Sequence, residues 1–387
     1  MTMLFSPYTL RNVTFKNRVV IAPMCTYSAE GGLASDWHLV HLGKFALGGA
    51  GAVMTEAAAV QERGKITHGD LGIWSGEHAR ALQPVISFIQ AQGAKAGVQL
   101  AHAGRKASMQ RPWFGNGPLN EDDHARGDMP WRVIGPSAEA LDDGWLTPAE
   151  MATGDIFQLI KDFQAAARRC DDIGCDFIEL HCAHGYLMQS FLSPLSNKRD
   201  DEWGGDLARR MAAPLTVVKS VRASWPRHKP LFVRISSVDG VEGGWSLDDS
   251  VAFASELKKI GVDIIDCSSL GNTAQGATAA PGKRGVGFQT PYSARIRAEA
   301  DLPTMAVGLI LTGEIAEQTL QEGRADLIAV GREALKDPFW AHHAAEELGV
   351  ETFDDWPHQY GWWLDKRRGA VKGMQTDPEL AALPKLS

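Results

Sequence analysis

Residues 153–180 read TGDIFQLIKDFQAAARRCDDIGCDFIEL and contain both patterns on which the fold prediction depends. Over Gly154–Asp172 the apolar residues recur at helical spacing, with Thr153 as the expected N-cap and Gly174 just past the end. The run Asp176–Leu180 then predicts a short buried strand. An amphipathic helix that leads directly into such a strand is typical of parallel α/β folds.

The same kind of apolar run recurs along the chain and predicts eight strands. Most of these runs are almost continuously hydrophobic, which indicates strands covered on both faces and therefore a parallel sheet. The predicted strands are Arg18–Ala22, Gly51–Thr55, Ala96–Leu100, Asp176–Leu180, Pro230–Val233, Val262–Asp266, Thr304–Val307 and Asp326–Val330. Amphipathic helices lie between them, and one of these, Asp248–Ile260, ends at Gly261 immediately before the next strand.

Eight βα units in 387 residues predict a single-domain α/β protein with a closed (β/α)₈ barrel, the TIM barrel. An open doubly wound sheet is the alternative. Against it, no GxGxxG follows the first strand, and polar residues recur at the carboxyl ends of many strands instead of at one switch point. We assign residues 1–369 to the barrel, with an inserted loop region of about 106–146 over its carboxyl-end face, and residues 370–387 to a polar tail.

Composition and charge exclude several classes of protein. With 44% hydrophobic and 22% charged residues, the chain has the composition of a folded globular protein. Its net charge of −8 provides no basic surface for nucleic acid or an anionic membrane, and no apolar run is long enough to cross a bilayer. The N-terminus lacks the pattern of a signal peptide and the five cysteines are scattered singly, so we expect a cytoplasmic protein without disulfides or an iron–sulfur cluster.

Polar and reactive side chains follow the predicted strands. In a barrel enzyme the active site forms at the carboxyl ends of the strands. The sequence places there Cys25, Tyr27, Glu56, Gln99, His102, His181, His184 and Arg234. The last two strands run into Gly308 and into Gly331-Arg332, and glycine turns beside an arginine suit a phosphate group. These glycines also have a simpler interpretation, as the ordinary ends of strands.

Several segments of the chain resemble one enzyme family. The most diagnostic is residues 181–205, HCAHGYLMQSFLSPLSNKRDDEWGG, in which His-x-x-His-Gly-Tyr-Leu precedes Phe-Leu-Ser-Pro and Asn-x-Arg. The others are KNRVVIAPMCTYSAEGG, HGDLGIWSGEHARAL, GVQLAHAGRKA, LFVRISS, VDIIDCSS and ADLIAVGREALKDPFW. Over almost its whole length the chain thus resembles the Old Yellow Enzyme family of FMN-dependent ene-reductases, specifically its thermophilic-like and xenobiotic reductase branch.

The resemblance implies a bound FMN and the residues that contact it. The isoalloxazine ring would contact Ala22, Pro23, Met24, Cys25, Ala57 and Gln99, and the phosphate would be held by Gly308, Gly331 and Arg332. Arg234 would lie beside the pyrimidine edge, where a guanidinium stabilises the negative charge of reduced flavin. A salt bridge inside the barrel is the alternative for this arginine. Cys25 would adjust the redox potential of the flavin, or it is merely a buried thiol.

The resemblance also implies catalytic and substrate-binding residues. His181 and His184 would donate hydrogen bonds to the carbonyl oxygen of the substrate, and Tyr186 would protonate its α-carbon. Tyr27 would contact the substrate from the opposite wall. Two alternatives are that the histidines form half of a metal site and that Tyr186 is only a wall of the pocket. No third ligand recurs at a convincing position, so we predict no metal.

The C-terminal region departs from part of this branch, in which an arginine after Pro-x-Gln-Tyr reaches into the neighbouring subunit's active site. Here the segment 357–361, PHQYG, is followed by Trp362 and Trp363. We expect a homodimer or tetramer in which Trp362, or alternatively Trp363, lines the partner's substrate pocket, where an aromatic wall would favour flat, apolar ring substrates. The alternative is that both indoles pack on their own barrel.

These observations together predict an FMN-dependent enzyme that takes hydride from NADPH or NADH and reduces the activated C=C bond of α,β-unsaturated carbonyl compounds. The reaction would be ping-pong, with both substrates using one face of the flavin in turn, so no separate dinucleotide fingerprint is expected. A barrel aldolase acting on a phosphorylated substrate and a noncatalytic flavin-binding protein remain as alternatives. The aldolase would need a lysine at the end of a late strand, where the sequence has Arg234, Ser268, Gly308 and Gly331.

Overall fold

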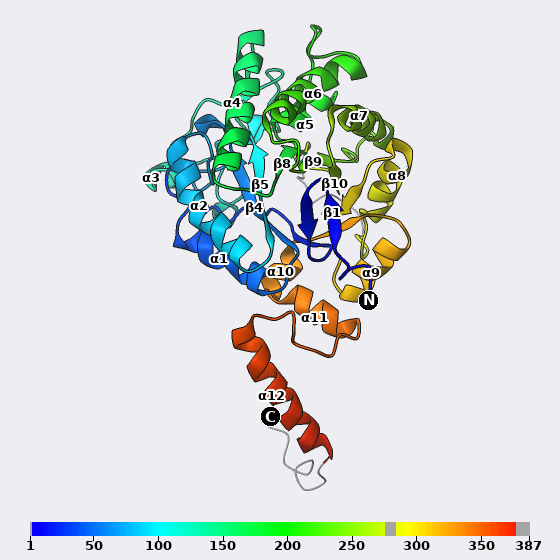
Figure 1. Cartoon of the computed structure of the whole chain (residues 1–387). Helices are drawn as coiled ribbons and strands as arrows, with labels where there is room; N and C mark the ends of the chain where they lie inside the picture. Colours follow the sequence, from blue (N-terminus) through cyan, green and yellow to red (C-terminus); the bar gives the residue numbers. More distant parts are fainter. Residues whose placement is uncertain (1, 275–283, 377–387) are drawn as a thin grey trace.

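Eight parallel strands form a closed barrel at the centre of the computed structural model, which describes residues 2–274 and 284–376 (Figure 1). Around the barrel the strand order is β10-β11-β12-β3-β4-β5-β8-β9. The strands are β3 (Val19–Ile21), β4 (Ala52–Ala59), β5 (Lys95–Ala101), β8 (Phe177–Cys182), β9 (Leu231–Ser236), β10 (Ile264–Ser268), β11 (Thr304–Ala306) and β12 (Leu327–Val330). Each corresponds to one of the eight predicted strands, so the predicted barrel is confirmed and the open sheet is excluded.

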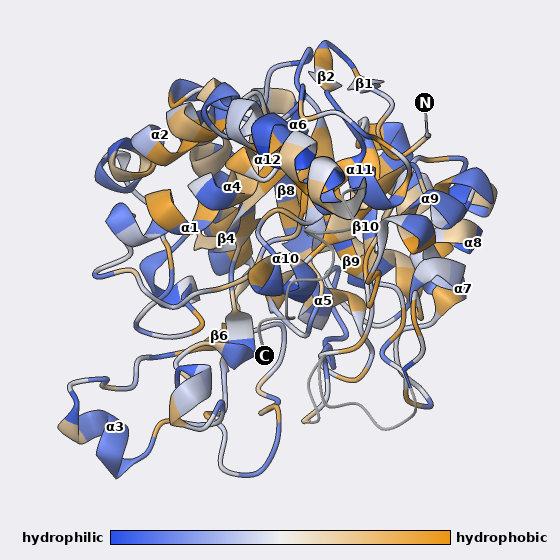
Figure 2. Cartoon of the chain, turned by 90° about the horizontal axis from the view of Figure 1, so that it is seen from below, coloured by the Kyte–Doolittle hydropathy of each residue, from blue (hydrophilic) through white to orange (hydrophobic). Residues whose placement is uncertain are grey.

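Helices cover the outside of the barrel, and the apolar residues concentrate on the strands and on the helix faces that meet them (Figure 2). One helix follows each strand: α1 (Asp36–Leu47), α2 (Gly76–Ala91), α4 (Thr153–Asp172), α6 (Leu207–Ser224), α7 (Leu247–Ile260), α8 (Thr290–Ala300), α9 (Gly313–Gln321) and α11 (Trp340–Glu347). Two short helices, α5 (Leu187–Leu192) and α10 (Arg332–Lys336), follow β8 and β12, and α12 (His358–Thr376) extends away from the barrel (Figure 1). Within the described ranges, no helix combines the length and the apolar character needed to cross a membrane.

Both helices predicted above are present, and the start of α4 corrects one detail. Thr153 is its first helical residue, and the N-cap is Ala152. The Ala152 N–H donates to the Asp155 carboxylate at 3.1 Å, so a carboxylate inside the first turn replaces the expected hydroxyl cap. α7 ends at Ile260, as predicted, before Gly261 in the left-handed conformation with φ +96°.

Side chains from alternate strand positions fill the barrel interior. Near the amino ends, Phe177 of β8 and Phe232 of β9 pack with their ring centroids 4.9 Å apart. A hairpin that the sequence analysis did not predict, β1 (Tyr8–Leu10) and β2 (Val13–Phe15), adds the Phe15 ring 5.7 Å from that of Phe177. Because Phe15 is fully buried within this cluster, the hairpin closes the amino end of the barrel.

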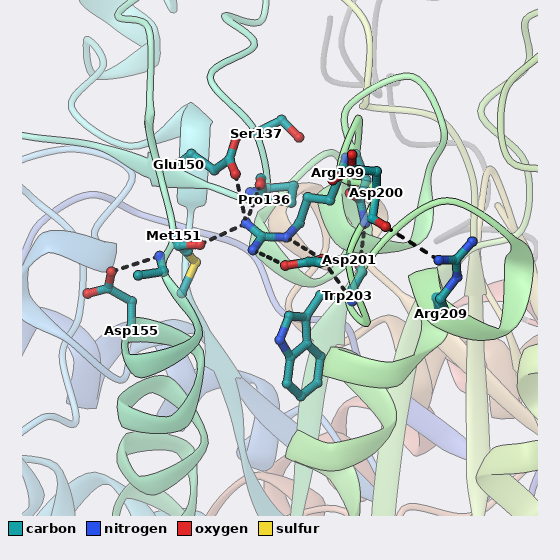
Figure 3. A network of polar contacts seen from close by, with 12 residues as sticks. Pro136, Ser137, Glu150, Met151, Asp155, Arg199, Asp200, Asp201, Trp203 and Arg209 are labelled. Carbon is teal, nitrogen blue, oxygen red and sulfur yellow. Dashed lines mark hydrogen bonds and ion pairs between the residues drawn. The ribbon is translucent and has the colours of Figure 1, made fainter.

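The connection between β5 and α4 contains the inserted loop region and extends beyond the barrel at α3 (Glu121–Ala125) (Figure 2). Its last part forms a small sheet of β6 (Ile134–Gly135) and β7 (Ala149–Glu150). Arg199, in the loop after α5, anchors this part of the connection (Figure 3). Its guanidinium donates to Pro136 O at 2.9 Å and to Met151 O at 2.7 Å, and it also pairs with Asp201. The diagnostic segment 181–205 therefore also holds the insertion in place.

Truncation of Phe15 tests the contribution of the hairpin. We expect Phe15→Ala to lower the free energy of unfolding by about 3–5 kcal/mol, because it removes a fully buried ring and leaves a cavity against Phe177 and Phe232. Urea unfolding followed by circular dichroism measures the change. The matched control, Phe15→Leu, retains most of the apolar volume and should lose clearly less stability. Equal losses in the two variants would contradict closure of the barrel by this ring.

Candidate active site

A cavity of about 530 Å³ opens at the carboxyl ends of the barrel strands. Its volume lies within the roughly 300–1,000 Å³ that is typical of ligand and cofactor sites. The cavity is lined by ten of the predicted site residues: Ala22, Pro23, Met24, Tyr27, His184, Tyr186, Arg234, Gly308, Gly331 and Arg332. The barrel thus brings together residues that lie more than 300 positions apart in the chain.

Five predicted site residues do not line the cavity. Ala57, Gln99 and His181 are buried near the carboxyl ends of their strands. Cys25 is half-buried and packs in one cluster with Tyr27 and Tyr186. Trp362 lies on α12 with 57% of its surface exposed, so within a single chain it contributes nothing to this site.

His181 and His184 meet at the edge of the cavity, with His181 Nε2 at 3.3 Å from His184 Nδ1. The Ala183 N–H donates to His181 Nδ1 at 3.2 Å, which assigns the proton of this neutral ring to Nε2. On its far side, His184 Nε2 lies 2.7 Å from Ser268 Oγ at the end of β10. With its proton on Nε2, His181 donates to His184 Nδ1, and the His184 proton then resides on Nε2, facing Ser268 Oγ.

Burial keeps both imidazoles neutral. Desolvation lowers the pKa of His181 and of His184 well below the ordinary value, and the positive charges of Arg234 and Lys106 lower both further. Among the described residues, no group of three or more histidine, cysteine, aspartate or glutamate side chains is arranged to hold a metal ion. Paired neutral N–H donors suit an oxygen that gains negative charge during a reaction.

The backbone around His184 is held in a conformation that few residues adopt. His184 has φ +60° and is followed by Gly185 with φ +76°. The His184 N–H donates to Ser236 Oγ at 2.9 Å, and this hydroxyl donates to Leu270 O at 2.7 Å. A Cβ on Gly271 would lie 2.4 Å from His184 Cα. Two loops from different strands therefore approach so closely that only glycine fits between them.

Lys106 joins the same two loops. It ends the 3-10 turn η2 (Gly104–Lys106), and its ammonium donates to His184 O at 2.8 Å and to Gly271 O at 3.0 Å. Burial and the charge of Arg105 lower its pKa to about 8. The ammonium also lies 5.1 Å from the centre of the Tyr186 ring, within the range of a cation–π contact. A single buried lysine thus fixes the positions of His184 and Tyr186.

Tyr186 is the N-cap residue of α5 and lies directly beside the histidines. Its ring lies edge to face with that of His181, at a centroid distance of 5.0 Å. Burial is the main reason that the pKa of Tyr186 lies well above the ordinary value for tyrosine. Its hydroxyl therefore keeps a proton at neutral pH, as a proton donor must.

A turn after β3 places Tyr27 at the cavity and Cys25 next to it in the same apolar cluster. The buried Glu56 carboxylate accepts hydrogen bonds from the Thr26 N–H and, at 2.8 Å, from the Thr26 hydroxyl. His38 Nε2 lies 3.2 Å from the other Glu56 oxygen. Burial raises the pKa of both Cys25 and Tyr27, so both remain protonated. A protonated thiol is a poor nucleophile.

Arg234 combines both roles that the sequence suggested. It lines the cavity, and its Nε lies 3.1 Å from Asp266 Oδ2 within the barrel. This distance makes an ion pair, but the angle does not allow a hydrogen bond, so the buried Nε has no hydrogen-bond partner among the described residues. A guanidinium held in this way retains unused donor capacity at the cavity.

Gly308, Gly331 and Arg332 lie on one side of the cavity, because parallel pairing of β11 with β12 brings the ends of these strands together. A Cβ on Gly308 would lie 2.7 Å from Gln289 Nε2, which donates to Val307 O. A side chain at Gly308 would therefore disturb the cavity wall. This side of the cavity offers backbone N–H groups and a guanidinium.

The structure adds lining residues that the sequence analysis did not assign to the site. They are Ile66, Lys106, Met109, Asn116, Leu141, Trp145, Ser268, Ser269, Thr273, Ala274, Arg284, Phe288, Gln289 and Val307. The serine doublet at 268–269, two residues after the predicted strand Val262–Asp266, was a signal that could have identified Ser268 and Ser269. No comparable pattern marks Trp145 or Leu141 within the insertion. His102, which the sequence placed at a strand end, instead contacts Gln61 Oε1 at 3.1 Å outside the cavity lining.

The neutrality of the histidine pair predicts a pH dependence of stability. In the unfolded chain each ring has a pKa of about 6.5, whereas the buried rings stay neutral at that pH. Below this pH the unfolded state binds more protons than the folded state, so we expect the free energy of unfolding to fall on acidification. Urea unfolding between about pH 7.5 and about pH 5.5 compares wild type with His181→Gln/His184→Gln. The double variant should lose part of the dependence, and an unchanged dependence would contradict the assignment.

Comparison with known proteins identifies the family. Residues 3–351 match the model of the NADH:flavin oxidoreductase / NADH oxidase family. The chain is 42% identical to an NADPH dehydrogenase of Geobacillus sp. (strain WCH70), over 93% of this chain and 99% of that protein. It is 44% identical to the NADPH dehydrogenase of Bacillus cytotoxicus, over 93% and 96% of the two chains, and 40% identical to that of Bacillus subtilis, over 93% and 99%.

Solved structures show the same fold. Morphinone reductase superposes with a TM-score of 0.74 at 20% identity, over 89% of this chain and 90% of that chain. A 2-naphthoyl-CoA reductase superposes with a TM-score of 0.79 at 23% identity, and this chain spans 52% of its length. The family match and the relatives, by contrast, extend over nearly the whole chain, so the resemblance stated from the sequence is confirmed. The protein belongs to the NADH:flavin oxidoreductase / NADH oxidase family, the Old Yellow Enzyme family, and is an FMN-dependent NAD(P)H oxidoreductase.

Proposed function

We propose that this oxidoreductase is an ene-reductase, which transfers a hydride from NADPH or NADH to the activated C=C bond of enones, enals and similar compounds. The observation that carries the proposal is the approach of His181 and His184 to 3.3 Å beside Tyr186, at the cavity of about 530 Å³. Two neutral donors and one proton source are the groups that such a reduction requires. Membership in an oxidoreductase family removes the aldolase and the noncatalytic alternatives.

The cavity fits FMN. Arg234 lines it with a guanidinium that forms an ion pair with Asp266, and Gly308 and Gly331 line it without side chains of their own beside Arg332. We assign the ring contacts to Ala22, Pro23, Met24, Cys25, Ala57 and Gln99, the pyrimidine edge to Arg234, and the phosphate to Gly308, Gly331 and Arg332. FMN bound there supplies the two-electron hydride chemistry that side chains lack.

His181 and His184 bind the carbonyl oxygen of the substrate in this proposal. Their N–H groups draw electron density from the conjugated double bond, which makes its β-carbon more electrophilic. As that carbon accepts hydride, negative charge develops on the oxygen, so the two donors act more strongly in the transition state than in the ground state. A carbonyl oxygen that replaces the contact between the two rings accepts from both when the His184 proton lies on Nδ1, and the Ser268 hydroxyl then donates to His184 Nε2, 2.7 Å away.

Tyr186 completes the reduction by transferring its hydroxyl proton to the α-carbon. The contact of its ring with His181 places the hydroxyl-bearing side chain next to the carbonyl-binding pair. Tyr27 binds the substrate from the other wall, and Ile66 and Trp145 help to exclude water at the mouth of the cavity. The nicotinamide and the enone would occupy this cavity in turn, in a ping-pong reaction.

NADPH is the hydride donor that the relatives support, since those named above are NADPH dehydrogenases at 40–44% identity. All five cysteines are free thiols, which is typical of the reducing cytoplasm, where we place the enzyme. Reduction of xenobiotic enones is the role that we assign to it there.

Stopped-flow measurement of the two half-reactions tests this function. The holoenzyme should be bleached by NADPH, and 2-cyclohexen-1-one should then restore the flavin absorption without oxygen. Tyr186→Phe should slow the second half by about 10²–10⁴-fold while leaving the first nearly intact, because only the second half needs a proton at the α-carbon.

The matched control is Tyr8→Phe, at the amino end of the barrel, which should change neither half-reaction. A wild-type enzyme that NADPH reduces but no enone reoxidises would refute the proposal. Equal rates in wild type and Tyr186→Phe would assign the proton transfer to another group.

We also propose a homodimer or tetramer assembled through α12. Trp362 and Trp363 are 57% and 67% exposed, so in the single chain they do not pack on their own barrel. On α1, Trp37 and Val40 are also exposed and border a groove of about 390 Å³ that includes Thr26, next to the active-site Tyr27. Clustered exposed apolar side chains of this kind mark interaction surfaces. A partner's α12 seated there would bring Trp362 to the edge of the pocket.

Trp362→Ala tests this assembly. We expect it to lower the oligomeric mass in light scattering and to raise the KM for ring-shaped enones several-fold, because truncation of a buried interface aromatic typically costs more than about 1 kcal/mol. FMN affinity should stay unchanged. Phe157→Ala removes an equally exposed aromatic from α4 and serves as the control. A monomeric wild-type protein would refute the role of Trp362.

A further inference from the structure

Two buried carboxyl groups, Glu179 and Asp266, lie inside the barrel and have no role in the reaction described above. Together with Gln99 and Arg234, which contact them, they form what we call the buried charge cluster. Strand pairing sets Gln99 opposite Glu179 between β5 and β8, and Arg234 opposite Asp266 between β9 and β10. Glu179 and Asp266 have no exposed surface, and Arg234 is only 7% exposed. Arg234 alone reaches the lining of the cavity.

The two carboxyl groups of the buried charge cluster have different surroundings. Asp266 Oδ2 lies 3.1 Å from Arg234 Nε and forms the ion pair. Glu179 Oε1 accepts a hydrogen bond from Gln99 Nε2 at 2.8 Å, and Glu179 Oε2 has no partner among the described residues. The guanidinium therefore has one close counter-charge, and the second carboxyl group is bound only through a neutral amide.

The groups that face Glu179 do not supply a second positive charge. β9 contributes Arg234, β10 contributes Asp266, β5 contributes the amide of Gln99, and β8 itself adds the thiol of Cys182. The neighbouring helix α5 has no ionisable side chain. With both carboxyl groups ionised, a site shielded from water would carry a net charge of −1, and burial of such an uncompensated charge is costly.

We propose that Glu179 carries a proton in the resting enzyme, so that the buried charge cluster is neutral and Arg234 keeps its effective positive charge at the cofactor. Burial and the charge of Asp266 raise the pKa of Glu179 well above its ordinary value, in agreement with this geometry. Glu179 is thus a charge-setting residue that acts on the flavin through Arg234. The inference rests on the proposed position of FMN beside Arg234, and it is independent of the enone.

The proton on Glu179 matters because reduction of FMN adds negative charge where Arg234 stabilises it. An ionised Glu179 beside an ionised Asp266 would outweigh the single guanidinium and oppose that charge. The protonated form removes this opposition and leaves the Gln99 amide hydrogen bond in place. Glu179 therefore makes the flavin easier to reduce without contacting the substrate.

Midpoint potentials of bound FMN distinguish the two charge states. Glu179→Gln replaces a neutral acid with a neutral amide, so the potential at pH 7 should stay within the error of wild type. Glu179→Gln/Asp266→Asn removes the negative charge of Asp266 without letting Glu179 ionise in its place, and it should raise the potential by at least about 30 mV, which is a tenfold shift in a two-electron equilibrium. If Glu179 is ionised instead, Glu179→Gln alone will raise the potential, and the proposal fails.

Infrared spectroscopy provides a second measurement that does not depend on turnover. The wild-type holoenzyme should show the C=O stretch of a protonated carboxylic acid at pH 7, and this band should be lost in Glu179→Gln. In Asp266→Asn the band should weaken, because loss of the Asp266 charge favours ionisation of Glu179 beside Arg234. Glu242→Gln, an exposed loop residue, is the matched control and should change neither the band nor the potential. Absence of the band from wild type would overturn the proposal.

The two proposals can fail separately. An enzyme that reduces no enone but shows the band and the raised potential of Glu179→Gln/Asp266→Asn would refute the proposed function and support the charge assignment. A Glu179→Gln/Asp266→Asn variant that folds and binds FMN with an unchanged potential would overturn the link between the buried charge cluster and the cofactor.

Discussion

Pairing of the last barrel strand with the first is the interaction on which the rest of the site depends. Ile328, Ala329 and Val330 of β12 pair in parallel with Val19, Val20 and Ile21 of β3 and close the ring of strands. Closure sets Ala22–Met24, just past β3, beside Gly331 and Arg332, just past β12. The surface assigned to the flavin ring and the surface assigned to its phosphate thus become parts of one cavity. Because all eight barrel strands are parallel, their carboxyl ends lie together at the same rim of the barrel.

Within that rim, the positions of the reactive groups are set by residues that do not react. The His184 backbone N–H donates to the Ser236 hydroxyl of β9, which helps to fix the position of His184. The loop with His184 also packs so closely against Gly271 that no side chain fits between the two loops. Lys106, from the turn after β5, binds carbonyl groups of both loops and also contacts the Tyr186 ring. Three strands therefore cooperate to hold one histidine and one tyrosine. Reactive side chains must be held in one geometry by the residues around them, and these three strands provide such contacts.

The features that could be predicted from the sequence are those whose physical cause produces the same pattern several times along the chain. Buried parallel strands must be apolar, and so all eight appeared as apolar runs. Site residues such as His184 and Arg234 could be predicted because they follow these apolar runs, where the carboxyl ends of the strands form the site. Contacts between residues far apart in the sequence left no local signal: the burial of Phe15 against Phe177 and Phe232, and the hydrogen bonds from Lys106 to His184 O and Gly271 O. Whether a residue such as His181 lines the cavity or lies at its edge also depends on packing that the spacing of residues does not specify.

The pairing of β12 with β3 also has a consequence for how the enzyme is made. Its two strands are separated by roughly 300 residues, so the chain emerging from the ribosome cannot complete the barrel until nearly all of it has been synthesised. Contacts between such distant residues form slowly, because the entropy of a long loop must be lost first. The cavity, assembled from the first and last strands, is therefore among the last regions to form. Insertion of the cofactor becomes a late, post-translational event, and a chain cut short before β12 would expose two unpaired strand edges.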